Sequence, residues 1–304
     1  MSNHRFTCHS IAVPLRTFMD EGPVPDGTVL GSSPTAAYLA FDDFVVALTA
    51  RTVPLMPNGA TVIESDGLDA FEAGSAVRAS SGGLRAGRVE VFCDGAVPVD
   101  LAVSPNGDHG ARTVALRGRD LLEAMGHDDD PVAAIADACP ELGAGDGLEA
   151  VKLLLAALSH GRRETAREAA GLLTGRGSGL TPDGDDLLAA AAASTLGFEG
   201  PAGTSRDIGP RFRTALLVED LGDRTGALSA TLLRLAARGH VIEPVRSLLD
   251  LGVDRPTWMR ALNRLERIGH STGTTYALGC ALTAVALSGG YGSDQAGQLQ
   301  EEKT

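Results

Sequence analysis

The sequence predicts an α+β protein, with a β-rich N-terminal part followed by a mostly α-helical C-terminal part. Short strand-type runs separated by turn formers occupy residues 28–115, and helical periodicity dominates from residue 116 to residue 290. The composition is that of a globular protein, with 43% hydrophobic and 21% charged residues. A length of 304 residues is sufficient for two domains, each with its own core.

The β-rich part, residues 28–115, is expected to form an antiparallel sheet or a small barrel. Its strand-type runs include AAYLAF, FVVALTA, ATVIES, VEVFC and VPVDLAV, and turn formers such as MPNGA and SSGG separate them. Residues 1–27 mix polar residues with proline and are expected to be a loosely ordered entry segment. Residues 291–304 are expected to be a polar tail.

The helical part carries apolar residues at the spacing of one helix face. Segments such as GLEAVKLLLAALSHG and RPTWMRALNRLERIG repeat apolar positions at i, i+3, i+4 and i+7. An alanine-rich helix is expected to end near residue 197, and GTTYALGCALTAVALSGG predicts another apolar helix. No repeat of fixed period is present, which disfavours a solenoid.

Charge and cysteine usage exclude several classes of protein. The net charge of −13 repels nucleic-acid phosphates and anionic lipids, and no basic cluster compensates for it. No apolar run reaches the length of a membrane span, and the N-terminus lacks a secretory signal. The four cysteines are scattered without CxxC spacing, as expected of reduced thiols in a cytoplasmic protein rather than a disulfide framework or a zinc site.

The segment TGRGSGLTPDGDD, residues 174–186, stands directly before the alanine-rich helix. Gly175, Gly177 and Gly179 allow positive φ, so successive backbone N–H groups can converge on an anion. Thr181 or Asp183 can cap the helix, whose positive end also attracts anions. A purely structural interpretation, in which the aspartates only cap the helix and complement its dipole, has about equal weight.

Three familiar motifs do not account for this loop. A dinucleotide-binding fold requires a strand before the glycines, and the preceding residues are helical. A P-loop requires Lys and Ser or Thr where Asp185 and Asp186 stand, and the acidic spacing does not fit an EF-hand.

A second polar, glycine-flanked loop, RIGHSTGTTYALG, opens the last apolar helix. Its Gly269–Gly273 segment formally matches the G-x-S-x-G nucleophile elbow, but a helix rather than a strand precedes it and no histidine follows Ser271. Ser271 is therefore interpreted as a hydrogen-bond donor to a ligand. His270 could act as an acid, as a ligand donor or as a helix cap. Arg224, between the two loops, could bind a carboxylate or phosphate, although an ordinary surface arginine is the better-supported interpretation.

Three segments in order resemble a bacterial family that includes the small subunit of oxamate carbamoyltransferase and is associated with allantoin and purine-nitrogen catabolism. They are GRGSGLTPDGDDLLAA, DRTGALSATLLRLAARGHVIEPVRSLL and ALNRLERIGHSTGTTYALGCAL. The GxGLTPxGDD signature is intact, the TTxLS segment has Gly226 at its second position, and GHSSGxD has Thr275 in place of its acidic residue. The resemblance is strong over residues 150–290 and weaker over the β-rich part.

The resemblance implies carbamoyl chemistry, in which phosphate attacks an N-carbamoyl 2-oxo amide to give carbamoyl phosphate and oxamate. It implies a small anionic substrate, phosphate and larger partner subunits, with Asp185 or Asp186 acting as a base or binding Mg²⁺. The alternative is a non-catalytic subunit that binds a small anion or regulates a catabolic complex. The residues assigned to catalysis are Asp185, Asp186, His270 and Ser271, and those assigned to anion binding are Gly177, Ser178, Gly179, Thr181, Gly184, Arg224, Thr225, Ser229, Thr272 and Gly273.

Overall fold

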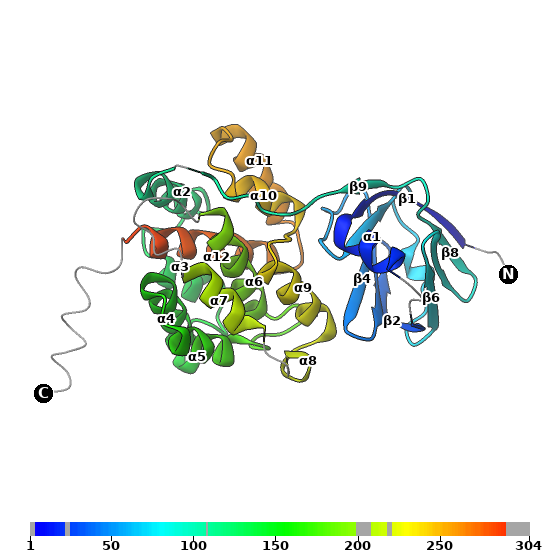
Figure 1. The fold of residues 1–304 in the computed structure, drawn as a ribbon, viewed down its shortest axis with the longest axis horizontal. Coiled ribbons are helices and arrows are strands. Elements are labelled where there is room, and N and C mark those ends of the chain that lie inside the picture. Colours follow the sequence, from blue (N-terminus) through cyan, green and yellow to red (C-terminus); the bar gives the residue numbers. More distant parts are fainter. Residues whose placement is uncertain (1–3, 22–24, 108, 199–207, 218–220, 290–304) are drawn as a thin grey trace, which may run out of the picture.

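The computed structural model describes residues 4–21, 25–107, 109–198, 208–217 and 221–289. A β-barrel and a helical region lie side by side, and the segment after the last strand runs from the barrel to the first helix of the helical region (Figure 1). The chain is therefore an α+β protein with the strands first, which confirms the predicted fold class. The predicted polar tail lies outside the described residues.

Eight strands close the barrel in the order β5, β4, β3, β2, β6, β7, β8 and β1, and β1 pairs again with β5. A ninth strand, β9, lies beside β1 outside this ring. The strands are β1 His4–Ala12, β2 Gly27–Ser33, β3 Ala36–Phe41, β4 Phe44–Ala50, β5 Gly59–Val62, β6 Ala76–Ser80, β7 Gly83–Ala86, β8 Val89–Phe92 and β9 Val97–Val99. Closure leaves this short-stranded sheet with few exposed edges.

The barrel is mixed rather than wholly antiparallel. Strand β1 runs parallel to β8 and β9, and β4 runs parallel to β5, whereas the remaining pairs are antiparallel. The residues predicted to form a loosely ordered entry segment instead contain β1 and the helix α1, Val13–Asp20. A bulge at His9 shifts the register of β1 between Cys8 and Ser10, which lets one strand pair first with β8 and then with β5 and β9.

Strand β4 is buried on both faces and joins the two parts of the fold. Val46 and Leu48 point into the barrel core, while Val45 and Ala47 pack with the core of the helical region. This explains why FVVALTA is a continuous apolar run rather than an alternating one. The contact is fixed by a hydrogen bond of 3.0 Å from the Val45 backbone N–H to the Thr231 hydroxyl.

The helical region begins at residue 111. Its helices are α2 Ala111–Ala124, α3 Pro131–Ala138, α4 Gly145–His160, α5 Arg163–Leu173, α6 Asp183–Gly197, α7 Ile208–Leu216, α8 Leu221–Arg224, α9 Ala227–Ala237, α10 Glu243–Leu249, α11 Arg255–Leu265 and α12 Thr272–Leu287. Among the described residues, no helix is both long enough and apolar enough to span a membrane.

Helices α6 and α12 form the centre of this region and are buried on nearly all sides. Small residues let their backbones approach closely: a Cβ atom at Gly279 of α12 would lie 2.6 Å from the Cβ of Ala190 of α6. The alanine-rich sequence is thus needed for packing. It also places the N-terminal ends of α6 and α12, which carry the two predicted loops, next to each other.

Candidate functional site

The loops before α6 and α12 lie in direct contact. The hydroxyl oxygens of Thr181 and Thr272 are 3.0 Å apart, and the Ser271 hydroxyl donates to Oδ1 of Asp183 at 2.6 Å. The start of α9 joins them, because the Ser229 hydroxyl lies 3.4 Å from the carbonyl oxygen of Leu180. Three helix N-termini therefore meet at one place, as the hypothesis of a composite site requires.

Glycines in the first loop have the backbone conformation that the nest hypothesis expects. The φ angles are +116° at Gly177 and +92° at Gly179, both in the region that side chains disfavour. Ser178, Gly179 and Leu180 are exposed, with Leu180 at 60%. This part of the loop is the one that a ligand in solution can reach.

Two glycines assigned to anion binding have a different role. The backbone N–H of Gly184 donates to the carbonyl oxygen of Arg176 at 2.8 Å, and that of Gly273 donates to Ile268 at 3.1 Å. A Cβ at Gly184 would lie 2.1 Å from the carbonyl oxygen of Leu173, and one at Gly273 would lie 1.8 Å from that of Leu265. These glycines make room for neighbouring backbone, and their amides are already hydrogen-bonded.

Asp183 connects the start of α6 to the start of α12. Besides the bond from Ser271, its Oδ1 atom lies 3.4 Å from the Thr275 hydroxyl. Thr275 in turn lies 3.2 Å from the Sγ atom of Cys139. Burial raises the pKa of the Cys139 thiol to about 11, so the group is a neutral thiol near neutral pH.

Asp185 connects the same loop to the segment before α9. Its Oδ1 accepts from the backbone N–H of Gly175 at 2.9 Å, and its Oδ2 accepts a short hydrogen bond from the Thr225 hydroxyl. Burial raises the pKa of Asp185, while the hydrogen bonds from Thr225, Gly175 and Ser229 oppose that shift. Both carboxylate oxygens are therefore occupied within the protein.

Asp186 is the unusual member of the group. Its side chain is 1% exposed, and its Oδ2 atom has no hydrogen-bond partner among the described residues. Burial raises the pKa of Asp186 well above its usual value, although hydrogen bonds from Thr272 and Thr181 act in the opposite direction. An unpartnered buried carboxylate oxygen is costly and is a common mark of a functional position.

The two aspartates expected to bind Mg²⁺ do not offer a common set of free oxygens. Asp185 uses both of its oxygens, and Asp186 is hydrogen-bonded by Thr272 and Thr181 while its Oδ2 has no partner among the described residues. The part of the chain that the structure describes holds no group of three or more acidic, histidine or cysteine side chains suited to a metal ion. Because Mg²⁺ requires several oxygen ligands in octahedral geometry, this donor set does not fit it.

Two further candidates lie at the edge of the site. His270 is exposed on the loop before α12. Arg224 is half-buried and donates from Nη2 to the carbonyl oxygen of Gly171 at 2.6 Å, near the C-terminal end of α5. A cation at this position complements the helix dipole, so part of the guanidinium group is used to hold α5.

Some contributors were not assigned from the sequence. Asp183 was interpreted only as a helix cap, and Cys139 was not connected to the site. Asp183 stands in the same signature as Asp185 and Asp186, so the motif carried a signal for it. Cys139 directly follows α3, far from the motif in the sequence, and carried none.

The fold and the site together define the class of protein. It is an α+β protein in which glycine-rich loops precede buried helices of the helical region, and the N-termini of those helices lie in contact. Residues 173–284 match the model of the family described as "Oxamate carbamoyltransferase subunit AllH". The matched segment is less than half of the chain and lies wholly in the helical region. Comparison with curated proteins and with solved structures gave no match.

Proposed function

We propose that this chain is the subunit of an oxamate-type carbamoyltransferase that binds the small carbamoyl substrate and phosphate at the three helix starts. The observation that carries the proposal is the extent of the family match, since residues 173–284 include all three segments that meet there. The family description names a subunit, so further carbamoyltransferase subunits are part of the proposal.

The proposed reaction is phosphorolysis of an N-carbamoyl 2-oxo amide. A phosphate oxygen attacks the carbamoyl carbon, the bond from that carbon to the amide nitrogen breaks, and the nitrogen leaves with a proton as oxamate. The exposed backbone around Ser178 and Gly179 is suited to hold an anion. The Ser271 hydroxyl donates to Asp183, so Ser271 could stabilise an oxyanion only if the ligand displaced that hydrogen bond. Asp186, whose pKa is raised by burial, is suited to supply the proton.

A non-catalytic role in binding or regulation is the second candidate, and one observation favours it. Asp185 and Asp186 are 2% and 1% exposed, and Asp185 is held by two hydrogen bonds within the protein. In that case the aspartates fix the loops, and only the exposed backbone meets the ligand. Turnover by the assembled subunits separates the two roles, because Asp186→Asn abolishes it only if the carboxyl takes part in chemistry.

Ligand-induced thermal stabilisation tests binding directly. The panel is phosphate, carbamoyl phosphate, oxamate and oxalurate, added to the chain alone and to the chain with its partner subunits. A ligand at a hundred times its Kd adds about 2.7 kcal/mol to the stability of the folded state. Gly179→Ala should abolish this gain, because Gly179 has a φ of +92°, which an alanine adopts only with strain, so the loop changes shape. The new methyl group has open space around it, so the effect comes from the backbone and not from a clash.

Gly74→Ala is the matched control. Gly74 has φ of +82°, has the same open space, and lies in the barrel. The two variants should lose similar stability without ligand, while only Gly179→Ala loses the response to anions. Equal ligand responses in both variants, or no response in the wild-type assembly, would overturn the proposal.

A further inference from the structure

A second feature of the molecule is a cavity of about 580 Å³ between the barrel and helices α10 and α11. Backbone hydrogen bonds join the two parts beside it, from Glu243 N–H to the Leu55 carbonyl at 3.0 Å and from Val241 N–H to the Leu101 carbonyl at 3.1 Å. Its volume lies in the range of small-molecule sites. No residue of the glycine-rich loops lines it, so it is separate from the site described above.

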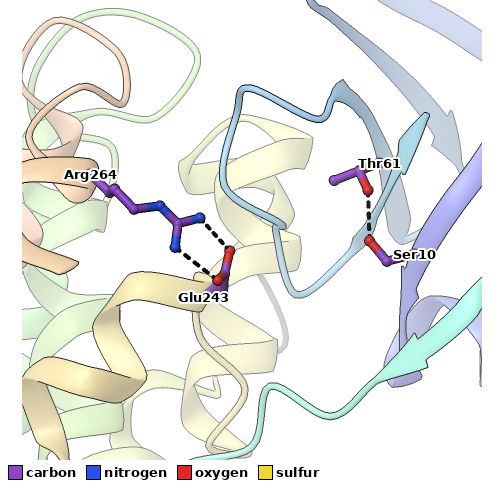
Figure 2. A network of polar contacts seen from close by, with 4 residues as sticks. All are labelled: Ser10, Thr61, Glu243 and Arg264. Atoms are coloured by element: carbon purple, nitrogen blue, oxygen red, sulfur yellow. Dashed lines mark hydrogen bonds and ion pairs between the residues drawn. The ribbon is translucent and has the colours of Figure 1, made fainter. Parts of the chain in front are cut away.

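The walls of this cavity are positively charged although the chain has a net charge of −13. Arg51, Arg246 and Arg264 line it together with a single carboxylate, Glu243. Glu243 is used by Arg264, which donates to its two oxygens at 3.0 and 2.7 Å (Figure 2). Within the residues that the structure describes, Arg51 and Arg246 make no ion pair, so two positive charges are left without a carboxylate.

Arg246 is held in place without being neutralised. Its Nη1 atom donates to the carbonyl oxygen of Asp100 at 2.7 Å, which anchors the side chain to the segment after β9. A carbonyl oxygen carries no full charge, so the guanidinium remains free to attract an anion. Arginine is suited to this role because its planar group can form paired hydrogen bonds with carboxylate or phosphate.

The barrel side of the cavity supplies a hydrogen-bond donor. The hydroxyl oxygens of Ser10 and Thr61 are 2.6 Å apart, and they lie on the barrel strands opposite the Glu243–Arg264 pair (Figure 2). In such a pair one hydroxyl donates to the other, and the proton of the acceptor hydroxyl remains available. Neither side chain has another hydrogen bond among the described residues, so one donor is free to bind a ligand.

The rest of the lining is the imidazole of His9 and hydrocarbon from Val53, Leu55, Val97, Val99 and Leu101. Apolar walls with a few placed polar groups are typical of sites for small organic molecules. Two unpaired guanidinium groups, one free hydroxyl donor and these walls lead us to propose that the cavity binds a small organic dianion. Dicarboxylates and phosphate monoesters share this chemistry. The proposal does not depend on the function proposed above.

Isothermal titration calorimetry at low ionic strength tests the proposal with three probes: succinate, glycerol phosphate and the neutral succinamide. The wild-type chain should bind at least one dianion and should not bind succinamide. Arg51→Gln and Arg246→Gln should each weaken binding about tenfold, the usual size of a lost charged hydrogen bond. Arg51 has no hydrogen bond or ion pair with other described residues, so its substitution should leave the fold intact.

Two further variants give the test its controls. Arg167→Gln removes the same charge from an exposed position on α5 and should leave dianion binding unchanged. Glu243→Gln should strengthen binding severalfold, because it removes the only carboxylate among the described residues that line the cavity and releases Arg264. If the Glu243–Arg264 ion pair only stabilised the fold, that substitution would not increase the affinity for the dianion.

Several results would overturn the proposal. They are the absence of binding by both dianions, equal binding of succinamide, and equal weakening by Arg167→Gln and Arg51→Gln. Abolition of dianion binding by Gly179→Ala would also overturn it, because the anion would then be bound at the glycine-rich loops. Binding of both dianions would leave the shared chemistry intact, and their relative affinities would distinguish carboxylate from phosphate.

Discussion

The buried carboxyl of Asp186 should make the protein less stable as the pH rises. An unfolded aspartate has a pKa of about 3.9, and burial raises the pKa of Asp186 in the folded state well above its usual value. The folded state therefore keeps its proton to higher pH than the unfolded state does. Below both pKa values the group has no effect, and between them stability falls by up to about 1.4 kcal/mol per pH unit. Above the folded pKa the penalty is constant.

The substitution Asp186→Asn removes this ionisation while nearly preserving the shape of the side chain. The carboxyl is 1% exposed, and its Oδ2 has no partner among the described residues. A buried group left unsatisfied costs about 1–3 kcal/mol, and more when it is charged. Repulsion from Asp185 and Asp183 adds to that cost. The variant should match the wild type near pH ~4 and exceed it by about 1–3 kcal/mol at neutral pH.

Urea denaturation over a series of pH values from weakly acidic to neutral measures the difference between the two proteins. Asp254 provides a control of opposite sign: hydrogen bonds from the Thr257 hydroxyl and from the Thr257 N–H lower its pKa, and the bond from the N–H, at 3.0 Å, caps α11. That contribution is present above the unfolded pKa and is lost as the pH falls through the folded pKa. Asp254→Asn should therefore cost stability at neutral pH and not in acid. Identical pH profiles for Asp186→Asn and the wild type would refute the reasoning.

Two further predictions, each with a companion variant, concern packing and hydrogen bonding in and beside the same helices. Gly279→Ala should destabilise the protein by about 1–3 kcal/mol in urea denaturation, because its methyl group would lie 2.6 Å from that of Ala190. Adding Ala190→Gly to that variant should recover most of the loss, and two additive losses would show that the helices are not in close contact. Thr225→Val should cost about 1–3 kcal/mol, increasingly as Asp185 ionises, because the carboxylate loses its Oδ2 donor. Thr225→Ser keeps that donor and should behave as the wild type does.

The fold was predictable from the sequence where structure depends on local pattern. The apolar runs of β3 and β4 and the periodic helices were identified, and the closed barrel confirms one of the two predicted architectures. Strand β1 was missed, because the bulge at His9 interrupts its alternation and its partners lie far along the chain. Which strands run parallel was equally hidden, since strand pairing depends on contacts that local pattern does not encode.

The glycine-rich loops were predictable as a unit, but the role of each aspartate was not. The partner of Asp183 is Ser271, and the partner of Asp185 is Thr225, each on a different segment of the chain. Composition and spacing identify these residue types without saying which pairs meet. The cavity between the barrel and helices α10 and α11 was missed for the same reason, since Arg51, Arg246 and Arg264 come together only when the barrel packs against the helices.

The resemblance implies an acidic residue at the position of Thr275, and the structure gives this departure a physical meaning. Thr275 is fully buried, and its hydroxyl lies 3.4 Å from Asp183 and donates to the Ser271 carbonyl at 3.1 Å. A carboxylate at this position would face Asp183 at close range in a buried environment, where two like charges require a cation or a shared proton. Threonine replaces that repulsion with a donor and leaves Asp183 in place to accept from Ser271. This chain thus keeps the connection between α6 and α12 with one negative charge fewer, which reduces the need for a bound cation at that point.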